Sequence, residues 1–178
     1  MTNGRRKGSV AEREVAALLQ GWWQAQEADV KFVRTPLSGG WSSAQVRGEF
    51  RASGDLMTTS PTFPFVVEVK RREGFSMDRL LSGGQSPVWG WWAQACNAAR
   101  EQQGRPLLWL RKNGGSWAVV LEDGLVVALV KKRLLGGRFV RGLVEIPHHG
   151  AIAVVAAPAL LGVHPADMLA LLPRVPPA

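Results

Sequence analysis

The stretch Phe65–Lys70 constrains the fold of this chain more than any other segment. Its sequence, Phe-Val-Val-Glu-Val-Lys, is typical of a buried β-strand that ends in a carboxylate and an ammonium group. Because side chains alternate across a strand, Glu68 and Lys70 are predicted to share one face with Val66. The other apolar side chains of the stretch then point to the opposite face. The run is apolar enough to predict a central strand of a sheet.

A Gly-Asp pair places Asp55 thirteen residues before Glu68, a distance that suits a neighbouring strand. Two carboxylates and a lysine brought together can hold a divalent metal ion and orient a water molecule beside it. Such a site is suited to hydrolysing a phosphodiester. The alternative interpretation of Glu68 and Lys70 is a solvated pair on a half-exposed face. The cost of placing charges on an apolar strand favours the metal site.

Composition limits the class of protein. The chain has 178 residues, 46% of them hydrophobic, which is enough for one sizeable core and argues against disorder over its whole length. The net charge of +8 favours a polyanionic partner. Nucleic acid fits this charge better than an anionic membrane surface does.

Targeting and redox signals are few. A single cysteine, Cys96, excludes an intramolecular disulfide, and no Cys/His spacing suggests zinc. No apolar segment follows the basic N-terminus, so it does not read as a secretory signal. The longest apolar run, residues 151–163, is too short to span a bilayer. We expect a soluble, intracellular, cytoplasmic protein with no membrane partner.

Local patterns predict the order helix, strands, helix, strands. Ser9 and Glu12 have the spacing of a capping box, which predicts a helix over residues 9–25. A short strand is expected over 30–34, followed by a Gly-, Ser- and Arg-rich loop over 36–53. Ser86 and Pro87 predict the start of a second helix that ends near Gly104.

The second half of the chain gives weaker signals. Strands are expected over residues 106–110, 117–121 and 152–155, and a short helix over residues 164–172. Residues 125–130 fit either a strand or a buried helix. We divide the chain into a core, 1–124, and a C-terminal extension, 125–178, without a firm boundary between them. The extension is expected to pack on the core or to form a dimer interface.

Four segments together resemble the PD-(D/E)XK nuclease superfamily, and within it the archaeal-type Holliday junction resolvases and related phage-encoded endonucleases. They are Lys7–Glu14, Val33–Thr35, Gly54–Asp55 and Glu68–Lys70. The opening Lys-Gly-x-x-Ala-Glu-Arg-Glu is the most specific part, and the likeness covers roughly residues 4–121. It implies an α/β, restriction-endonuclease-like αβββαβ core with a mixed central sheet flanked by helices, two divalent metals and dimeric action on branched DNA.

The resemblance also implies roles for individual residues. Asp55 and Glu68 would bind Mg²⁺, which Mn²⁺ could replace, with help from the backbone carbonyl of Val69. Lys70 would activate or orient the attacking water and stabilise the developing charge. Glu12 matches a helix-borne acid that belongs to the catalytic and metal-binding set, although a purely capping role remains open. Residues expected near the scissile phosphate or in support of the site are Arg13, Arg34 and Gln94.

Basic and aromatic residues near these elements are candidates for DNA binding. A phosphate-binding rim is predicted from Arg5, Arg6, Lys7, Arg71 and Arg72. In the long loop, Arg47 and Arg51 could hold DNA, and Trp41 could stack on an exposed base. The alternative for the charged residues is an ordinary solvated face.

The sequence therefore predicts a metal-dependent DNA endonuclease, most suited to branched DNA such as Holliday junctions, with a place in recombination or repair. A site-specific or broadly acting phage or repair endonuclease is the alternative within this class. A non-catalytic basic DNA-binding protein with a nuclease-like fold is the alternative outside it. We expect a homodimer, because two-fold symmetry suits a symmetric junction, and apolar residues in 125–130 and 151–172 offer an interface.

Overall fold

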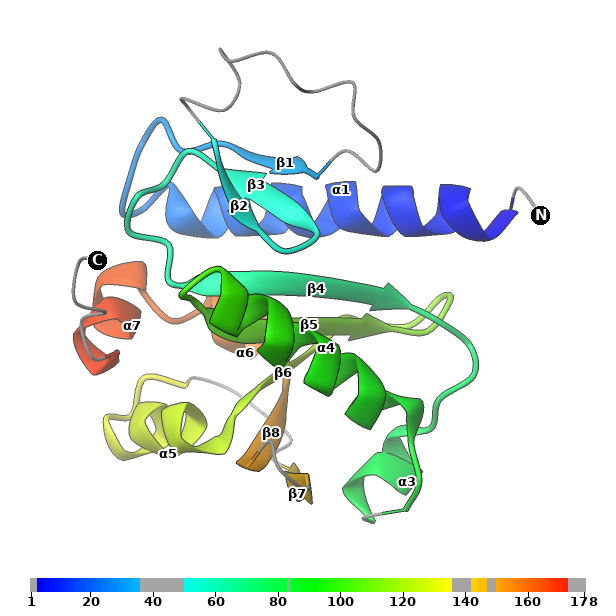
Figure 1. The fold of residues 1–178 in the computed structure, drawn as a ribbon. Helices are drawn as coiled ribbons and strands as arrows, with labels where there is room; N and C mark the ends of the chain where they lie inside the picture. The colour runs from blue at the N-terminus through cyan, green and yellow to red at the C-terminus, as the bar shows by residue number, and fades with distance from the viewer. Residues whose placement is uncertain (1–2, 36–49, 83, 136–141, 147–149, 173–178) are drawn as a thin grey trace.

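The computed structural model describes residues 3–35, 50–82, 84–135, 142–146 and 150–172 (Figure 1). In the first half of the chain the elements are α1 (Asn3–Trp23), β1 (Phe32–Arg34), β2 (Arg51–Ser53), β3 (Leu56–Thr58), β4 (Phe65–Arg71), α3 (Met77–Leu81) and α4 (Pro87–Glu101). In the second half they are β5 (Arg105–Arg111), β6 (Ala118–Glu122), α5 (Asp123–Lys131), β7 (Gly142–Ile146), β8 (Gly150–Ala156), α6 (Ala157–Leu161) and α7 (Pro165–Leu171).

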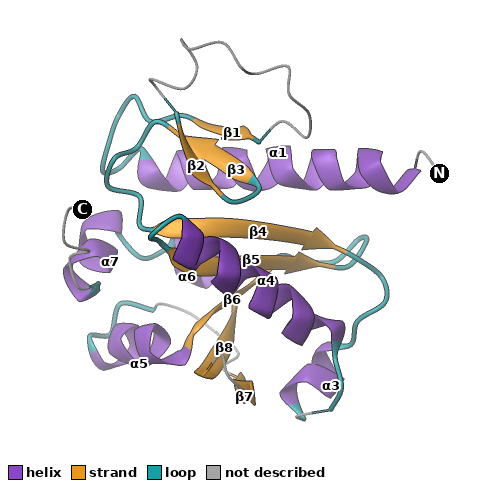
Figure 2. Ribbon diagram, in the orientation of Figure 1, coloured by secondary structure: helices purple, strands orange, loops and turns teal. Residues whose placement is uncertain are grey.

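The strands form two sheets. The larger sheet has the order β4-β5-β6-β8-β7, in which β4 and β5 are parallel and the other neighbours antiparallel. The smaller sheet has the order β1-β3-β2 and is antiparallel throughout. Helices flank the larger sheet (Figure 2). The prediction of an α/β fold with a mixed central sheet and a restriction-endonuclease-like core is confirmed.

Alternation along the strands divides the core into two layers. Val67 and Val69 of β4 belong to the cluster that contains buried residues of α1, α5, α6 and α7. The opposite face of the sheet packs against α3 and α4, where Trp92 is fully buried. Glu68 and Lys70 lie on this α4 face, since Lys70 hydrogen-bonds to Gln94 of α4. The predicted division of side chains between the two faces of β4 is confirmed.

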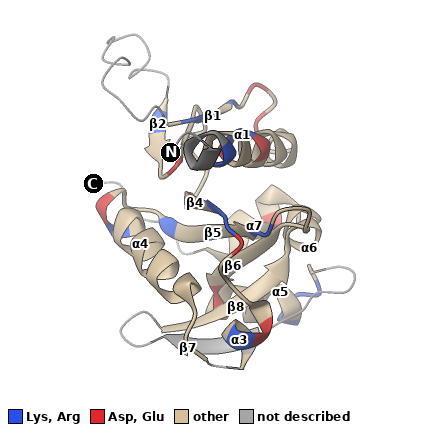
Figure 3. Cartoon of the chain, turned by 90° about the vertical axis from the view of Figure 1, so that its right-hand side faces the viewer, with Lys and Arg blue, Asp and Glu red and all other residues tan. Residues whose placement is uncertain are grey.

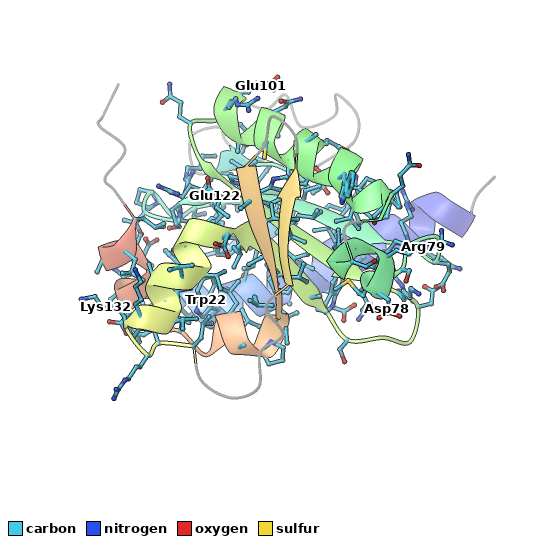
Figure 4. All side chains as sticks on the ribbon, turned by 90° about the horizontal axis from the view of Figure 1, so that it is seen from below. Trp22, Asp78, Arg79, Glu101, Glu122 and Lys132 are labelled. Carbon is cyan, nitrogen blue, oxygen red and sulfur yellow. The ribbon has the colours of Figure 1, made fainter. Side chains whose placement is uncertain are left out.

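The first helix covers one layer and differs from the prediction at its start. Its buried positions include Ala11, Val15 and Leu19, which recur at helical spacing as expected. The helix begins at Asn3, however, so the predicted capping box at Ser9 is wrong: Ser9 lies inside the helix. Near the other end, the indole Nε1 of Trp22 donates to the carbonyl of Val163 at 2.6 Å, which ties α1 to the turn before α7 (Figure 4).

The predicted loop over residues 36–53 is wrong at its end, because Arg51–Ser53 forms β2 and pairs with β3. Each of these strands has only three residues, too few to show alternation in the sequence. Residues 36–49 lie outside the described part of the chain. The segment 125–130 is helical and lies within α5. The short helices α3 and α6 and the strand β7 carried no signal that we recognised.

The chain beyond residue 124 continues the same architecture. Strand β8 pairs with β6 along Ala118–Glu122, so the larger sheet contains residues from both predicted parts. A division at residue 124 stays a prediction. Three of the apolar side chains expected to form a dimer interface, Leu125, Val126 and Leu129, are buried within the core, whereas Val130 is 40% exposed. The dimer interface stays a prediction. Within the described ranges, no helix is both long and apolar enough to cross a membrane.

Candidate active site

The candidate site lies along the outer edge of β4, where the smaller sheet meets the larger one. The prediction of a central strand is therefore wrong, because β4 is an edge strand of the larger sheet. Asp55 occupies the turn between β2 and β3, and the preceding Gly54 forms an isolated parallel bridge with Val67. The backbone N–H of Asp55 donates to the carbonyl of Val67 at 2.8 Å. The backbone N–H of Val69 in turn donates to the Asp55 carboxylate at 2.8 Å. These contacts fix Asp55 beside the strand that carries Glu68 and Lys70.

Only glycine fits immediately before Asp55. Gly54 has a φ of +76°, in the left-handed region that side chains disfavour. A Cβ atom at this position would also lie 2.2 Å from the carbonyl oxygen of Val67. The glycine therefore allows the two backbones to approach closely enough for Asp55 to reach β4. This is the physical basis of the Gly-Asp pair noted in the sequence.

Glu68 and Lys70 form a buried pair on the α4 side of the strand. Glu68 is only 5% exposed, and its carboxylate is ion-paired with the Lys70 ammonium. The Lys70 Nζ also donates to the Oε1 of Gln94 at 3.2 Å. Lys70 is thus held between a strand and a helix and does not extend into bulk solvent. This arrangement argues against a solvated surface pair.

The electrostatics of Asp55 reflect this crowding. Burial raises the pKa of Asp55, and the negative charge of Glu68 raises it further, to about 6. The hydrogen bond from Val69 and the positive charge of Lys70 act in the opposite direction but do not outweigh these effects. Two carboxylates that disfavour each other's charge are the kind of environment that a divalent cation relieves.

The donor set fits a hard divalent cation. Within a strand, the N–H and C=O of one residue point to the same edge. Since the N–H of Val69 faces Asp55, the Val69 carbonyl also faces that edge. Carboxylate and carbonyl oxygens are the ligands that Mg²⁺ prefers. Among the described residues, no group of three or more His, Cys, Asp or Glu side chains could hold a metal ion. The candidate ligands that the resemblance implies are Asp55, Glu68 and the Val69 carbonyl.

Glu12 approaches the site from α1. Its carboxylate is ion-paired with the Nε of Arg34 in β1, and its charge contributes to the raised pKa of Asp55. Because the helix begins nine residues earlier, at Asn3, Glu12 does not cap it. A capping role for Glu12, one of the two alternatives, is therefore excluded. The ion pair with Arg34 leaves direct metal binding by Glu12 a prediction.

The predicted DNA-binding residues fall into several environments. Lys7, Arg13 and Arg72 are exposed, and Arg5 and Arg6 lie in the first turns of α1. Arg71 donates from its Nε to the side-chain oxygen of Asn113 at 2.8 Å. Lys and Arg residues occur on α1, β1 and β4 on the side of the molecule shown in Figure 3. Trp41 and Arg47 lie outside the described residues.

Arg51 has a different use within the protein. Its guanidinium donates to the carbonyl of Ser60 at 2.6 Å and also to the carbonyl of Phe63. Burial lowers the pKa of Arg51, while the nearby charge of Glu27 raises it less. These bonds connect β2 to the segment before β4. The structure thus engages these donors internally and not at a DNA-facing surface.

Three further contacts near the site were not predicted. The Glu14 carboxylate accepts two hydrogen bonds from Arg111, at 2.5 and 2.6 Å, which join α1 to the end of β5. Thr35 and Gln102 both hydrogen-bond to Gly54. Thr35 lay within the recognised motif, but without a role. Gln102 gave no signal, because its partner lies 48 positions away in the sequence.

The comparisons agree with this geometry. The family described as Phage putative PDDEXK endonuclease matches residues 3–139, which is more than half of the chain and includes every proposed catalytic residue. Neither the search of curated proteins nor that of solved structures found a match. The matched region runs past β6 and through α5, and it ends before β7 and β8. The chain belongs to the phage PD-(D/E)XK endonuclease family.

Proposed function

We propose that this endonuclease hydrolyses DNA phosphodiesters with a divalent metal, Mg²⁺ or Mn²⁺, held at the edge of β4. The observation that carries the proposal is the Asp55–Glu68 pair, two interacting carboxylates beside a lysine that is fixed by Glu68 and Gln94. An ion pair that only stabilises the fold needs one carboxylate, that of Glu68, for the ammonium of Lys70. The second acid beside it has a clear use in metal binding.

Each residue then has a defined part. Asp55, Glu68 and the Val69 carbonyl would hold the cation, which when bound polarises a phosphate oxygen and lowers the pKa of a bound water. The Lys70 ammonium, fixed on both sides, would orient the attacking water and stabilise negative charge on the phosphate. Gln94 fixes the position of that ammonium. Glu12 holds the Arg34 guanidinium near the site, where it can contact a phosphate.

Branched DNA is the substrate that we propose within this class. The support is the resemblance of the helix and strand motifs to junction resolvases, together with basic residues on α1, β1 and β4 (Figure 3). A homodimer would let two such sites cut strands of opposed polarity in a symmetric junction. Leu125, Val126 and Leu129 of α5 are buried in the core, so of the large apolar residues in this segment Val130 is the exposed one that such an interface could use.

The test is a nicking assay that compares a four-way junction, a flap and a linear duplex, with Mg²⁺ and with EDTA. We expect Mg²⁺-dependent cleavage that is fastest on the junction, and none by Asp55→Asn. Equal rates on all three substrates would contradict branched-DNA selectivity alone. Cleavage in EDTA would contradict metal dependence. Light scattering with and without DNA tests the dimer, and a monomer throughout would overturn it.

A further inference from the structure

Asp55 and Glu68 belong to different sheets, so their alignment depends on how the sheets are joined. Asp55 lies at the tip of the β2–β3 turn in the smaller sheet, whereas Glu68 lies in the larger one. Among the described residues, one isolated bridge, Gly54–Val67, joins the two ladders. A single backbone bridge allows rotation about itself. Two side-chain bonds to β4 support the bridge: the hydroxyl of Ser53 donates to the carbonyl of Phe65 at 2.6 Å, and the carboxylate of Asp55 accepts from Val69. The N–H of Gly54 still needs a partner outside β4.

The Gly54–Asp55 backbone has two side-chain partners in addition to β4. The Oε1 of Gln102 accepts a hydrogen bond from the Gly54 N–H at 3.0 Å. The hydroxyl of Thr35 donates to the Gly54 carbonyl at 3.0 Å, and the Thr35 N–H donates to the Asp55 carbonyl at 2.8 Å. Thr35 follows β1 in the smaller sheet, while Gln102 follows α4 on the larger one. Gln102 is thus a side chain that bonds across the junction.

The side chain of Gln102 is not needed to cap the end of α4. It is the C-cap residue of α4, but the cap is made by its backbone N–H, which bonds to the carbonyls of Ala98 and Arg100. Its side chain is therefore available for Gly54. The same helix carries Gln94, which holds Lys70. Gln94 and Gln102 are eight residues apart, which corresponds to about 12 Å along a helix. The region of α4 therefore contacts the site both at Lys70 and at Gly54.

We infer that Gln102 is a positioning residue for metal binding: it holds the Gly54–Asp55 turn in place from α4, so that the Asp55 carboxylate meets Glu68. This inference rests on the proposed function and extends it to a residue outside the recognised motifs. Groups that orient metal ligands typically contribute 10- to 100-fold to metal affinity. A purely structural role would change stability without changing metal affinity.

The test compares three variants of the full chain. Gln102→Met keeps the size of the side chain and removes the acceptor, whereas Gln102→Glu keeps an acceptor. Gln24→Met is the matched control, because Gln24 is exposed and its side chain makes no hydrogen bond to the residues that the structure describes. The readouts are the amide hydrogen exchange rate of Gly54 by NMR and the dissociation constant of Mn²⁺ by titration calorimetry without DNA.

For Gln102→Met we expect exchange at Gly54 to be at least about tenfold faster and the Mn²⁺ dissociation constant to rise by about 10- to 100-fold. Gln102→Glu should restore the Gly54 protection, and Gln24→Met should match the wild type in both readouts. Cleavage by Gln102→Met should recover as Mg²⁺ is raised. Should this variant fail to fold, Thr35→Val, which removes the other side-chain bond to Gly54, should shift both readouts in the same direction.

The outcomes separate this inference from the proposed function. If the wild type binds Mn²⁺ and Gln102→Met binds it equally well, the positioning role is wrong and the proposed function stands. If the wild type binds no Mn²⁺ and cuts DNA in EDTA, the proposed function is wrong, and this inference falls with it. A change in stability with unchanged metal affinity would assign Gln102 to the fold alone.

Discussion

The carboxylate of Asp55 accepts a 2.8 Å hydrogen bond from the backbone N–H of Val69, the residue between Glu68 and Lys70. This contact brings an acid from the smaller sheet to the strand that carries the other acid and the lysine. It also orients the Asp55 carboxylate, because one oxygen is engaged by the backbone. The proposed cation would be shared between this carboxylate and that of Glu68.

Removal of either acid should abolish cleavage and preserve DNA binding. Asp55→Asn or Glu68→Gln removes a negative charge that faces phosphate, so affinity for DNA should be unchanged or higher. Added Mg²⁺ should raise the melting temperature of the wild type and leave that of both variants unchanged. Nicking assays, gel-shift titrations and thermal melts check these outcomes together. Full activity in either variant would contradict the proposed mechanism.

Loss of the lysine should slow cleavage by at least about a hundredfold, the scale seen when one preorganised electrostatic group is removed. The variant is Lys70→Met, measured by single-turnover kinetics at saturating Mg²⁺. Gln94→Met should have a smaller effect, because Glu68 still holds the ammonium. Lys131→Met, an exposed position on α5, is the control for loss of one positive charge. Equal rates for the Lys70 and Lys131 variants would exclude Lys70 from the chemistry.

Without metal, the contribution of Asp55 to the stability of the fold should fall as pH rises from about 4 to about 6. Burial and the charge of Glu68 raise the pKa of Asp55 from its ordinary 3.8 to about 6. Between these values the folded protein keeps a proton that the unfolded chain releases, so the free energy of unfolding decreases with pH. The full decrease is at most about 3 kcal/mol and is present above about pH 6.

Asp55→Asn isolates this effect, because asparagine does not titrate and can still accept the Val69 hydrogen bond. The difference in unfolding free energy between the variant and the wild type should grow with pH and level off above about pH 6. Denaturation in EDTA across this range measures it. A difference that is independent of pH would show that Asp55 is not crowded by its neighbours.

Substitution of Arg51 should lower the stability of the protein, whereas substitution of Arg72 should lower its affinity for DNA. Arg51→Met removes donors to the carbonyls of Ser60 and Phe63, which should cost about 1–3 kcal/mol of stability and leave DNA affinity unchanged. Arg72→Met changes an exposed residue beside the lysine strand, so stability should hold while DNA affinity falls. The slope of log affinity against log salt should decrease by about 1 for Arg72→Met only. A loss of DNA affinity with unchanged stability in Arg51→Met would instead assign Arg51 to DNA binding.

Much of the site was predictable because its residues lie close in sequence or follow a strict period. The alternation in β4 placed Glu68 and Lys70 on one face and Val67 and Val69 on the other, as the structure confirms. The Gly-Asp pair was a signal because glycine is required where two backbones touch. The capping box at Ser9 was misleading, since a local pattern can occur inside a helix that starts earlier.

Other features depended on partners far along the chain. The strands around Asp55 are too short to alternate, and they exist because β3 pairs with both β1 and β2. Arg51 was predicted to contact DNA, and only the folded chain shows that its guanidinium donates to the carbonyls of Ser60 and Phe63. The apolar segment of α5 looked equally suited to a core and to an interface, because composition does not distinguish one buried surface from the other.

The sequence by itself determined the residues of the candidate site: which acids, which lysine, and that Glu68 and Lys70 share one face of a strand. These follow from side-chain type and from the two-residue period of a strand, both of which are local properties. The tertiary structure alone decided how Asp55 meets Glu68, through the bridge at Gly54 and the side chains of Thr35 and Gln102. Such contacts join residues with no periodic relation, so only the folded chain reveals them.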